Sequence, residues 1–272
     1  MPLPKPTIDA LPLGAHRLLT LTDEQLYRST GVRIAFTGRD GGVSAGEFAS
    51  LNLGENVHDD ERAVLRNRAL VLEALGAPGA ALVMPHQVHG THIVEISPGD
   101  DVRAARDEAQ RDCDGLVVRA PGVAGGLIAA DCLLLAIVAP DGTFALTHAG
   151  WRGAVAGIAG KTARLLAARA GDAWSAADMN AYIGPHIGPE CFEVGPEVAE
   201  RFERKLGADA LEDARHVNLA RAVSIDLRHS GMRPERIAQC GICTVCNSDR
   251  YYSYRASGGK CGRHGMFAWR AG

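Results

Sequence analysis

The chain has 272 residues, of which 46% are hydrophobic and 22% charged, and its formal net charge is −3 at pH 7. A chain of this length can bury a complete core, so we expect it to fold without a partner. The nearly neutral charge, with no basic stripe, argues against nucleic acid as the main partner and favours small molecules.

The cellular location is predicted from the N-terminus and the cysteines. The first twenty residues carry prolines where a signal peptide needs an unbroken apolar run, and no window reaches about 18 uncharged apolar residues, the length of a membrane span. Seven cysteines are an odd number without the density of a disulfide scaffold, which favours reduced thiols. We therefore expect a cytoplasmic protein with no membrane partner, either a monomer or a homodimer.

Helical periodicity is clear in two segments. Residues 59–78 predict a helix that begins at acidic residues and ends at Gly76 and Pro78. Its predicted core face consists of Val64, Leu65, Ala69, Leu72 and Leu75. A second helix is predicted after Gly150, with Gly171 just past its end. Its predicted face consists of Val155, Ile158, Thr162, Leu165 and Leu166. No repeat or linker divides the chain, so we expect a single domain over 1–272, in which 1–30 form an N-terminal extension whose packing the sequence pattern does not define.

Two apolar runs flank Pro140-Asp141-Gly142 and predict a β-hairpin. If these three residues form the loop, Cys132 lies opposite Gly150, and the side chains of Cys132 and His148 share a face at about 7 to 8 Å between backbones. A two-residue Asp-Gly loop shifts the register by one and puts them on opposite faces. The first alternative allows one metal ion to bridge the two side chains.

A third ligand is sought in "MPHQVHGTHIVEI", where His86, His89 and His92 are three residues apart. The alternation that follows favours a strand, in which residues three apart point to opposite faces. Only one of the three histidines, or the outer pair, can therefore join the metal site. Three Cys and His ligands are typical of a catalytic zinc or copper site with an open position. The same residues also permit a metal-free site with Cys132 as the nucleophile and a histidine as its base.

The stretch "THAGWRGAVAG" joins the second hairpin strand to a helix through Gly150 and Gly153. These glycines, the helix N-terminus and the Arg152 guanidinium favour an anion such as phosphate, and Trp151 offers a flat face to a base. Alternatively the glycines are packing points and Arg152 is solvated.

A polar loop, "FTGRDGGVSAGEFASLNLG", supplies Arg39 and Asn52 as further pocket residues, although a hairpin turn explains its glycines equally well.

Three C-terminal cysteines, Cys240, Cys243 and Cys246, have C-x-x-C-x-x-C spacing, and Cys261 follows. A zinc knuckle from these four is one interpretation, and buried thiols are the other. The aromatic and basic residues beyond them, Arg263 included, suggest the wall of a pocket.

The chain also resembles a known family, the laccase-domain or multicopper polyphenol oxidoreductase proteins now described as purine nucleoside phosphorylases. The resemblance rests, in order and spacing, on "GRDGGVSAGEFASLNLG", "QVHGTHIV", "CDGLVV", "AADCLLLAI", "THAGWRG", "YIGPHIGPECFEVG", "DLRHSGM", "CTVC" and "YYSYRASGGKCGRHG". It implies a single-domain α+β fold, with mixed β-sheets flanked by helices in an αββα-like sandwich. It also implies a metal, Zn²⁺ or Cu²⁺, held by His89, Cys132 and His148.

The resemblance further implies a cytoplasmic purine nucleoside enzyme. The expected reactions are phosphorolysis of adenosine, inosine or methylthioadenosine and deamination of adenosine, with the metal lowering the pKa of water for attack at C6. Arg39 and the Arg152 turn are expected to hold phosphate, and Asn52 the sugar. The family's tail carries a second arginine where this chain has Ala256, so Lys260 or Arg263 is expected to compensate. Relatives have also been described as copper-dependent phenol oxidases and as peptidoglycan-precursor editing hydrolases, which would use Cys132 as the nucleophile.

Overall fold

Two six-stranded sheets form the centre of residues 2–272, the part of the chain that this computed structural model describes. The first sheet has the order β1 (Asp9–Leu13), β2 (Leu18–Thr22), β3 (Val32–Thr37), β12 (His264–Arg270), β7 (Val123–Ala129) and β4 (Ala81–Val83). The second has the order β11 (Ile237–Gln239), β10 (Asn180–Ile183), β8 (Leu133–Val138), β9 (Phe144–Ala149), β6 (Gly115–Val118) and β5 (Ile93–Ile96). Both sheets are mixed, because β4 runs parallel to β7 and β5 parallel to β6, whereas β8 and β9 are antiparallel.

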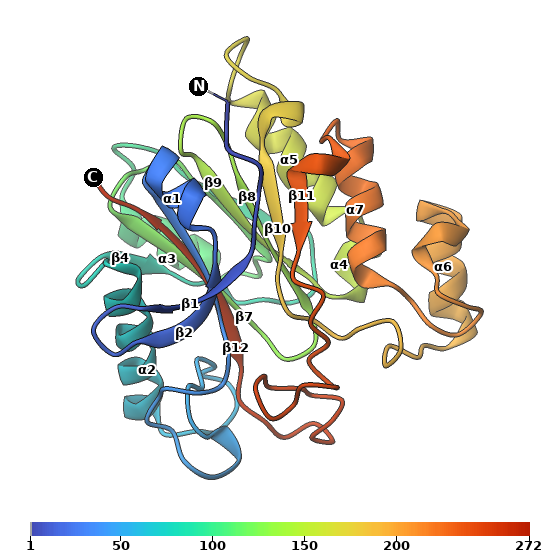
Figure 1. Cartoon of the computed structure of the whole chain (residues 1–272), viewed down its shortest axis with the longest axis horizontal. Helices are drawn as coiled ribbons and strands as arrows, with labels where there is room; N and C mark the ends of the chain where they lie inside the picture. Colours follow the sequence, from blue (N-terminus) through green and yellow to red (C-terminus); the bar gives the residue numbers. More distant parts are fainter. Residues whose placement is uncertain (1) are drawn as a thin grey trace.

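Helices flank the two sheets (Figure 1), and the buried residues of the first and third helices, Leu26, Ala105 and Ala109, join the core between the sheets. The helices are α1 (Glu24–Thr30), α2 (Glu61–Leu75), α3 (Val102–Ala109), α4 (Trp151–Val155), α5 (Ile158–Ala168), α6 (Pro196–Leu206) and α7 (Leu219–His229). Short 3₁₀ turns lie at Gly46–Phe48, Ala176–Asp178, Ala208–Ala210 and Pro234–Arg236. Helix α2 packs on the first sheet, and α4 to α7 pack on the second. The αββα-like α+β fold is therefore confirmed.

Strand β8 shows why the sheets stack in this way. All six of its residues are apolar and buried, because both of its faces are covered. Successive side chains of a strand point to opposite faces. Leu133, Leu135 and Ile137 join the core under α4 to α7, whereas Leu134, Ala136 and Val138 join the core between the two sheets.

The N-terminal segment is part of this architecture. Strands β1 and β2 extend the first sheet beyond β3, and Asp23 caps α1 by accepting a hydrogen bond from the backbone N–H of Leu26. The same carboxylate accepts a hydrogen bond from the Tyr182 hydroxyl at 2.9 Å, which ties α1 to β10 of the second sheet. Among residues 2–272 no helix has the length and apolar character needed to cross a bilayer.

The helix predicted over 59–78 is confirmed as α2, with Asp60 as its N-cap and Gly76 as a left-handed C-cap. Its predicted face was partly wrong, because Leu65 is 53% exposed. The buried side instead includes Asn67, whose amide donates to Ser44 Oγ and to the carbonyl of Asn52. A buried polar residue that satisfies its hydrogen bonds is not visible in an apolar pattern.

The single helix predicted after Gly150 was also wrong, since the chain forms two helices, α4 and α5. Gly157 has a φ of 79° and ends the helical path between them. The carboxylate of Asp226 on α7 accepts a hydrogen bond from the backbone N–H of Gly160 at 2.7 Å, so it caps the start of α5.

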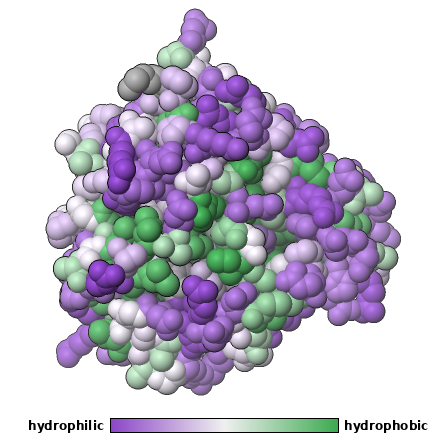
Figure 2. Space-filling model, in the orientation of Figure 1, coloured by the Kyte–Doolittle hydropathy of each residue, from purple (hydrophilic) through white to green (hydrophobic). Residues whose placement is uncertain are grey.

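Figure 2 shows hydrophilic residues spread over one face of the molecule, with hydrophobic residues gathered toward its middle. Scattered apolar groups are normal on the surface of a folded protein. Four of the large hydrophobic residues that are most exposed lie far apart in the sequence: Leu19, Val43, Leu65 and Val88.

Candidate active site

The hairpin of β8 and β9 has the register of the three-residue loop. The backbone N–H of Ala139 donates to the carbonyl of Thr143 at 2.9 Å, and Gly142 has a φ of 79°. Leu133 pairs with Ala149, which places Cys132 opposite Gly150 just beyond the strand ends. The prediction that Cys132 and His148 share a face is therefore confirmed.

His89 reaches the same place from a loop. The stretch expected to be a strand is irregular up to His92 and becomes strand β5 only at Ile93, so the strand prediction was wrong for His86 and His89. His89 itself has a φ of 62°. The structure separates the three histidines, because the imidazole of His86 pairs with Asp112 at 3.3 Å and that of His92 lies 3.7 Å from Glu108.

The Asp114 carboxylate holds the loop of His89 in place. Fully buried, it accepts hydrogen bonds from the backbone N–H groups of Val88 at 3.2 Å, His89 at 2.9 Å and Gly90 at 2.7 Å. Its Oδ1 also bonds Nδ1 of His148 at 2.7 Å. One carboxylate thus fixes the loop and leaves Nε2 of His148 free to face the cluster, as the outer carboxylate does in many metal sites.

His89, Cys132 and His148 each offer one ligand atom, and these atoms all lie within 4.8 Å of one another. The two imidazole rings are 4.8 Å apart between centroids, at 64°. Cysteine and histidine are the ligand types that zinc and copper prefer, and three protein ligands leave a position open. The donor set therefore fits the metal that the family resemblance implies.

The electrostatics of the cluster favour the thiolate of Cys132 and the carboxylate of Asp114. Burial opposes the Cys132 thiolate, but attraction to and hydrogen bonding with His148 and His89 outweigh it and lower the pKa of the thiol to about 6. Burial likewise opposes the charged Asp114, yet hydrogen bonds from His148 and Gly90 keep the pKa of its carboxyl below the ordinary value. Burial opposes the His148 imidazolium, but the Cys132 thiolate and the hydrogen bond to Asp114 raise the pKa of this ring, so a metal that binds here displaces a proton from it.

Gly150 is required where the backbone passes the cluster. A Cβ atom at this position would lie 2.2 Å from Nδ1 of His89 and 3.2 Å from Sγ of Cys132. Real Cβ atoms do not approach other atoms as closely as 2.2 Å, so any side chain here would displace the His89 imidazole. This close approach explains why a glycine follows strand β9.

The three side chains face a pocket of about 870 Å³, within the range of small-molecule sites. Trp151 and Arg263 line it, as predicted for a base-stacking and an anion-binding residue. Arg255, one of the basic residues predicted for the pocket wall, also lines it. The guanidinium groups of Arg68 and Arg106 line it too, and the sequence analysis did not select them.

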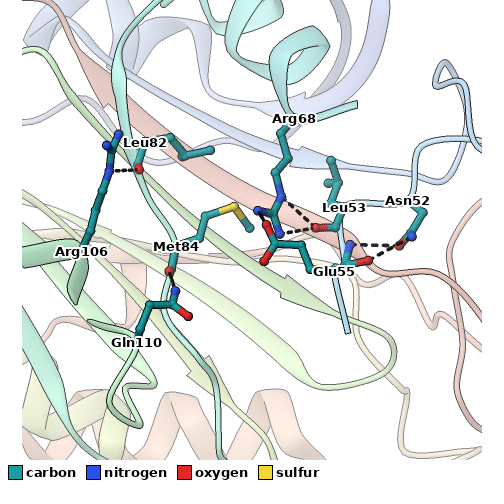
Figure 3. A network of polar contacts seen from close by, with 9 residues as sticks. Asn52, Leu53, Glu55, Arg68, Leu82, Met84, Arg106 and Gln110 are labelled. Atoms are coloured by element: carbon teal, nitrogen blue, oxygen red, sulfur yellow. Dashed lines mark hydrogen bonds and ion pairs between the residues drawn. The ribbon is translucent and has the colours of Figure 1, made fainter. Parts of the chain in front are cut away.

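Hydrogen bonds to the backbone fix part of this wall (Figure 3). Arg68 donates to the carbonyl of Leu53 at 2.8 Å and pairs with Glu55, and Arg106 donates to the carbonyl of Leu82 at 2.8 Å. Gln110 donates to the carbonyl of Met84, also at 2.8 Å. These contacts hold polar side chains of α2 and α3 at the rim of the pocket.

Other predicted residues lie outside the pocket wall. Arg39 donates to the carbonyls of Ala49 and Ser248, at 3.0 and 2.8 Å, and so joins two loops. The Asn52 amide is buried and bonds Asp59 and the backbone of Gly54.

Two further basic residues predicted near the site also lie off the pocket. Arg152 is exposed, with its guanidinium 4.4 Å from the centroid of the Trp151 ring. Lys260, the alternative to Arg263, instead pairs with Glu47 at 2.6 Å.

Asp114 and Asp131 are residues of the candidate site that sequence reasoning missed. Asp131 precedes Cys132 with a φ of 86° and accepts hydrogen bonds from the Thr244 hydroxyl at 2.6 Å and the backbone N–H of Arg255 at 2.7 Å. A signal was present in both cases, since each is an acidic residue beside an apolar strand, where a charge needs partners.

Of the two interpretations of the C-terminal cysteines, the zinc knuckle of all four was wrong, whereas Cys243 and Cys261 are buried as the other expected. Cys240 packs against the core between the sheets, and Cys261 lies in a small buried cluster with Ala130 and Tyr252. Cys243 and Cys246 instead lie beside Glu190 and Cys191. The spacing could not reveal this, because the third thiol comes from a distant part of the chain.

Comparison with known proteins places this two-sheet fold and its Cys/His cluster in a defined class. The family described as multi-copper polyphenol oxidoreductase laccase matches residues 33–271. The chain belongs to this family.

Its relatives carry a more specific name. The chain is 36% identical over 246 residues to purine nucleoside phosphorylase PA4543 of Pseudomonas aeruginosa, covering 88% of this chain and 93% of the relative. It is 34% identical over 250 residues to purine nucleoside phosphorylase YlmD of Geobacillus stearothermophilus, covering 88% and 90%. The crystal structure of the latter protein superposes with a TM-score of 0.82 at 30% identity over 100% of both chains. That of hypothetical protein YfiH from Bacillus licheniformis gives 0.83 at 29% identity, covering 92% and 96%.

Proposed function

We propose that the chain is a metal-associated purine nucleoside enzyme whose main reaction is phosphorolysis. The observation that carries this proposal is the convergence of His89, Cys132 and His148 on one pocket of about 870 Å³. The names of the relatives in Pseudomonas and Geobacillus support it. We assign Zn²⁺ or Cu²⁺ to the three side chains.

The protein's own groups prepare the site for this chemistry. Asp114 holds His148 in one orientation, and Gly150 gives His89 room beside Cys132. The metal would supply Lewis acidity and lower the pKa of a bound water molecule. Trp151 offers a flat aromatic face within the pocket, which suits a purine base.

Arg263 is the proposed phosphate-binding residue. It uses Nη1 for the carbonyls of Cys261 and Gly262, at 2.8 and 3.0 Å, and within residues 2–272 its Nε and Nη2 make no such bond. Those N–H groups remain for an anion in the pocket. In phosphorolysis a phosphate oxygen forms a bond to C1′ of the ribose while the bond from C1′ to the purine nitrogen breaks, and a positioned anion stabilises the charge that builds at C1′.

Deamination of adenosine is the second candidate activity. The specific observation in its favour is that the cluster offers three protein ligands, which is typical of sites that activate water. Water would add at C6 of the purine, and the amino group would leave as ammonia.

The test is incubation of purified, metal-loaded protein with adenosine, with and without phosphate. Phosphorolysis predicts adenine and ribose 1-phosphate only when phosphate is present, whereas deamination predicts inosine in both cases. Cys132→Ala and His148→Ala should abolish both activities and the metal bound at this cluster. His92→Ala is the matched control, because His92 is exposed and lies outside the pocket, and it should behave as the unmodified protein.

Other products would change the assignment. Absence of turnover by the metal-loaded protein would overturn the proposal. Dioxygen uptake with a phenol would favour the copper oxidase, and release of an amino acid from a peptidoglycan precursor would favour the editing hydrolase with Cys132 as nucleophile.

A further inference from the structure

A second group of metal-ligating side chains lies on the outer side of the loops that carry Ile187 and Arg255. It consists of Glu190, Cys191, Cys243 and Cys246, whose ligand atoms all lie within 4.8 Å of one another. Sγ of Cys246 is 3.5 Å from Sγ of Cys191 and 3.5 Å from a carboxylate oxygen of Glu190. The group is separate from the cluster of His89, Cys132 and His148.

These spacings match those of ligands around one tetrahedral ion. With Zn–S bonds of about 2.3 Å and a Zn–O bond of about 2.0 Å, tetrahedral geometry puts two sulfur atoms about 3.8 Å apart and a sulfur and an oxygen about 3.5 Å apart. A disulfide needs about 2.05 Å between its sulfur atoms. The distance of 3.5 Å between the sulfur atoms of Cys191 and Cys246 is therefore too long for a disulfide and close to that of two ligands of one ion.

Backbone hydrogen bonds hold the two loops that carry the cluster, and one of them reaches a thiol. The N–H of Gly188 points at Sγ of Cys243 at 3.2 Å, the type of outer contact that stabilises a metal-bound sulfur. His186 and Cys243 form a β-bridge, and the N–H of Thr244 donates to the carbonyl of His186 at 3.0 Å. The two ligand-bearing loops are thus held together before any ion binds.

The negative charges of the ionised side chains favour a bound cation within the cluster. Three thiols and a carboxylate within 4.8 Å repel one another once ionised, and no lysine or arginine side chain bonds them among residues 2–272. Soft thiolates select zinc or iron–sulfur centres, and the carboxylate disfavours copper(I). A single ion with four protein ligands is typical of structural zinc.

We propose that Glu190, Cys191, Cys243 and Cys246 form a closed structural zinc site that fixes the wall of the active-site pocket. The connection to the pocket is direct, because the Arg255 guanidinium donates to the carbonyls of Cys191 at 3.1 Å and Glu193 at 3.2 Å. Binding at this site does not depend on the reaction assigned to the pocket.

The test is zinc content per chain in variants of each site. The unmodified protein should hold about two zinc ions, and Cys246→Ala should hold about one, because a closed site needs all four ligands. Cys246 is exposed, so this change leaves the core intact. His148→Ala should also hold about one, and the double variant should hold none, with thermal unfolding confirming that each chain is folded.

Cys240→Ser is the matched control, since Cys240 lies in the same segment but packs against the core, and it should keep both ions. Replacement of the remaining ion in His148→Ala by cobalt(II) should give the visible absorption of a tetrahedral thiolate site, and Cys246→Ala should remove that absorption. Equal zinc in the unmodified protein and in Cys246→Ala would overturn the proposal. So would a Cys191–Cys246 disulfide in unreduced protein, shown by an intact mass lower by two hydrogens and by a proteolytic peptide that joins the two cysteines.

Discussion

Replacement of Asp114 by Asn tests whether one buried carboxylate organises the candidate metal centre. The carboxylate accepts four hydrogen bonds, three from the backbone of residues 88–90 and one from Nδ1 of His148. An amide of the same shape keeps one oxygen and replaces the other with a group that can only donate. Two arrangements are then possible, and both are unfavourable.

If the amide nitrogen faces His148, Nδ1 must become an acceptor and the ring proton moves to Nε2, the atom that faces the cluster. If the amide is reversed, its nitrogen meets the N–H groups of Val88 and Gly90, and each buried donor left unpaired costs about 1–3 kcal/mol. Loss of such an outer partner lowers metal affinity by about 10–100-fold, which is about 1.4–2.7 kcal/mol of binding free energy.

The assay is competition for zinc between the protein and a chromophoric chelator, carried out beside urea unfolding of the metal-free protein. Asp114→Asn should show the loss in affinity and a lower free energy of unfolding. Asp112→Asn is the control, because Asp112 is exposed and contacts only the exposed His86 in this region. An affinity of Asp114→Asn within twofold of the unmodified protein would refute the orienting role of this carboxylate.

Three further changes test other parts of the structure. Gly150→Ala should lower zinc affinity by about tenfold or more in the same competition assay, because the new Cβ would meet the His89 imidazole at 2.2 Å. Asp131→Asn should lower the free energy of unfolding in urea by about 1 kcal/mol, since a neutral amide replaces the carboxylate that accepts hydrogen bonds from Thr244 and Arg255. His264→Gln should make stability less dependent on pH between 6.5 and 4, measured by urea unfolding at each pH.

The sign of the last effect follows from burial. His264 is 1% exposed, and burial lowers the pKa of its imidazole from 6.5 to about 4. Between these pH values the unfolded chain binds a proton that the folded chain does not, so the free energy of unfolding decreases as the pH falls. The loss attributable to His264 is about 3 kcal/mol. Parallel pH profiles of stability for His264→Gln and the unmodified protein would contradict this assignment. Unchanged zinc affinity in Gly150→Ala would contradict the prediction for Gly150, and unchanged stability in Asp131→Asn would contradict the prediction for Asp131.

The parts of the site that the sequence predicted are those set by local geometry. The turn at residues 140–142 fixes the register of β8 and β9, and the register alone brings Cys132 and His148 to one face. The choice of His89 among three histidines could not follow from pattern. It depends on the contact of its loop with Asp114, a residue 25 positions away in the sequence.

Helices were predicted correctly where an apolar stripe marks them. They were missed or misplaced where a polar group determines the start, the end or the buried face of the helix. Residues 102–109 form α3, capped by Asp101, a helix that the sequence analysis did not predict. Long-range contacts with Asp226 interrupt the helix predicted after Gly150, and the amide network of Asn67 rotates the buried face of α2. Tertiary hydrogen bonds override local periodicity in each case.

The crossing from one sheet to the other explains why chemistry gathers at this place. Strand β7 ends at Ala129 in the first sheet, and β8 begins at Leu133 in the second, so the residues between them pair with neither sheet. Unpaired backbone must find other partners, and it does so when the N–H of Ile187 donates to the carbonyl of Asp131 at 2.9 Å. The Asp131 side chain then binds the C-terminal loop, while Cys132 points into the space at the end of the inter-sheet core. A connection that the topology requires therefore both ties the pocket wall to the sheets and presents the thiol to the pocket.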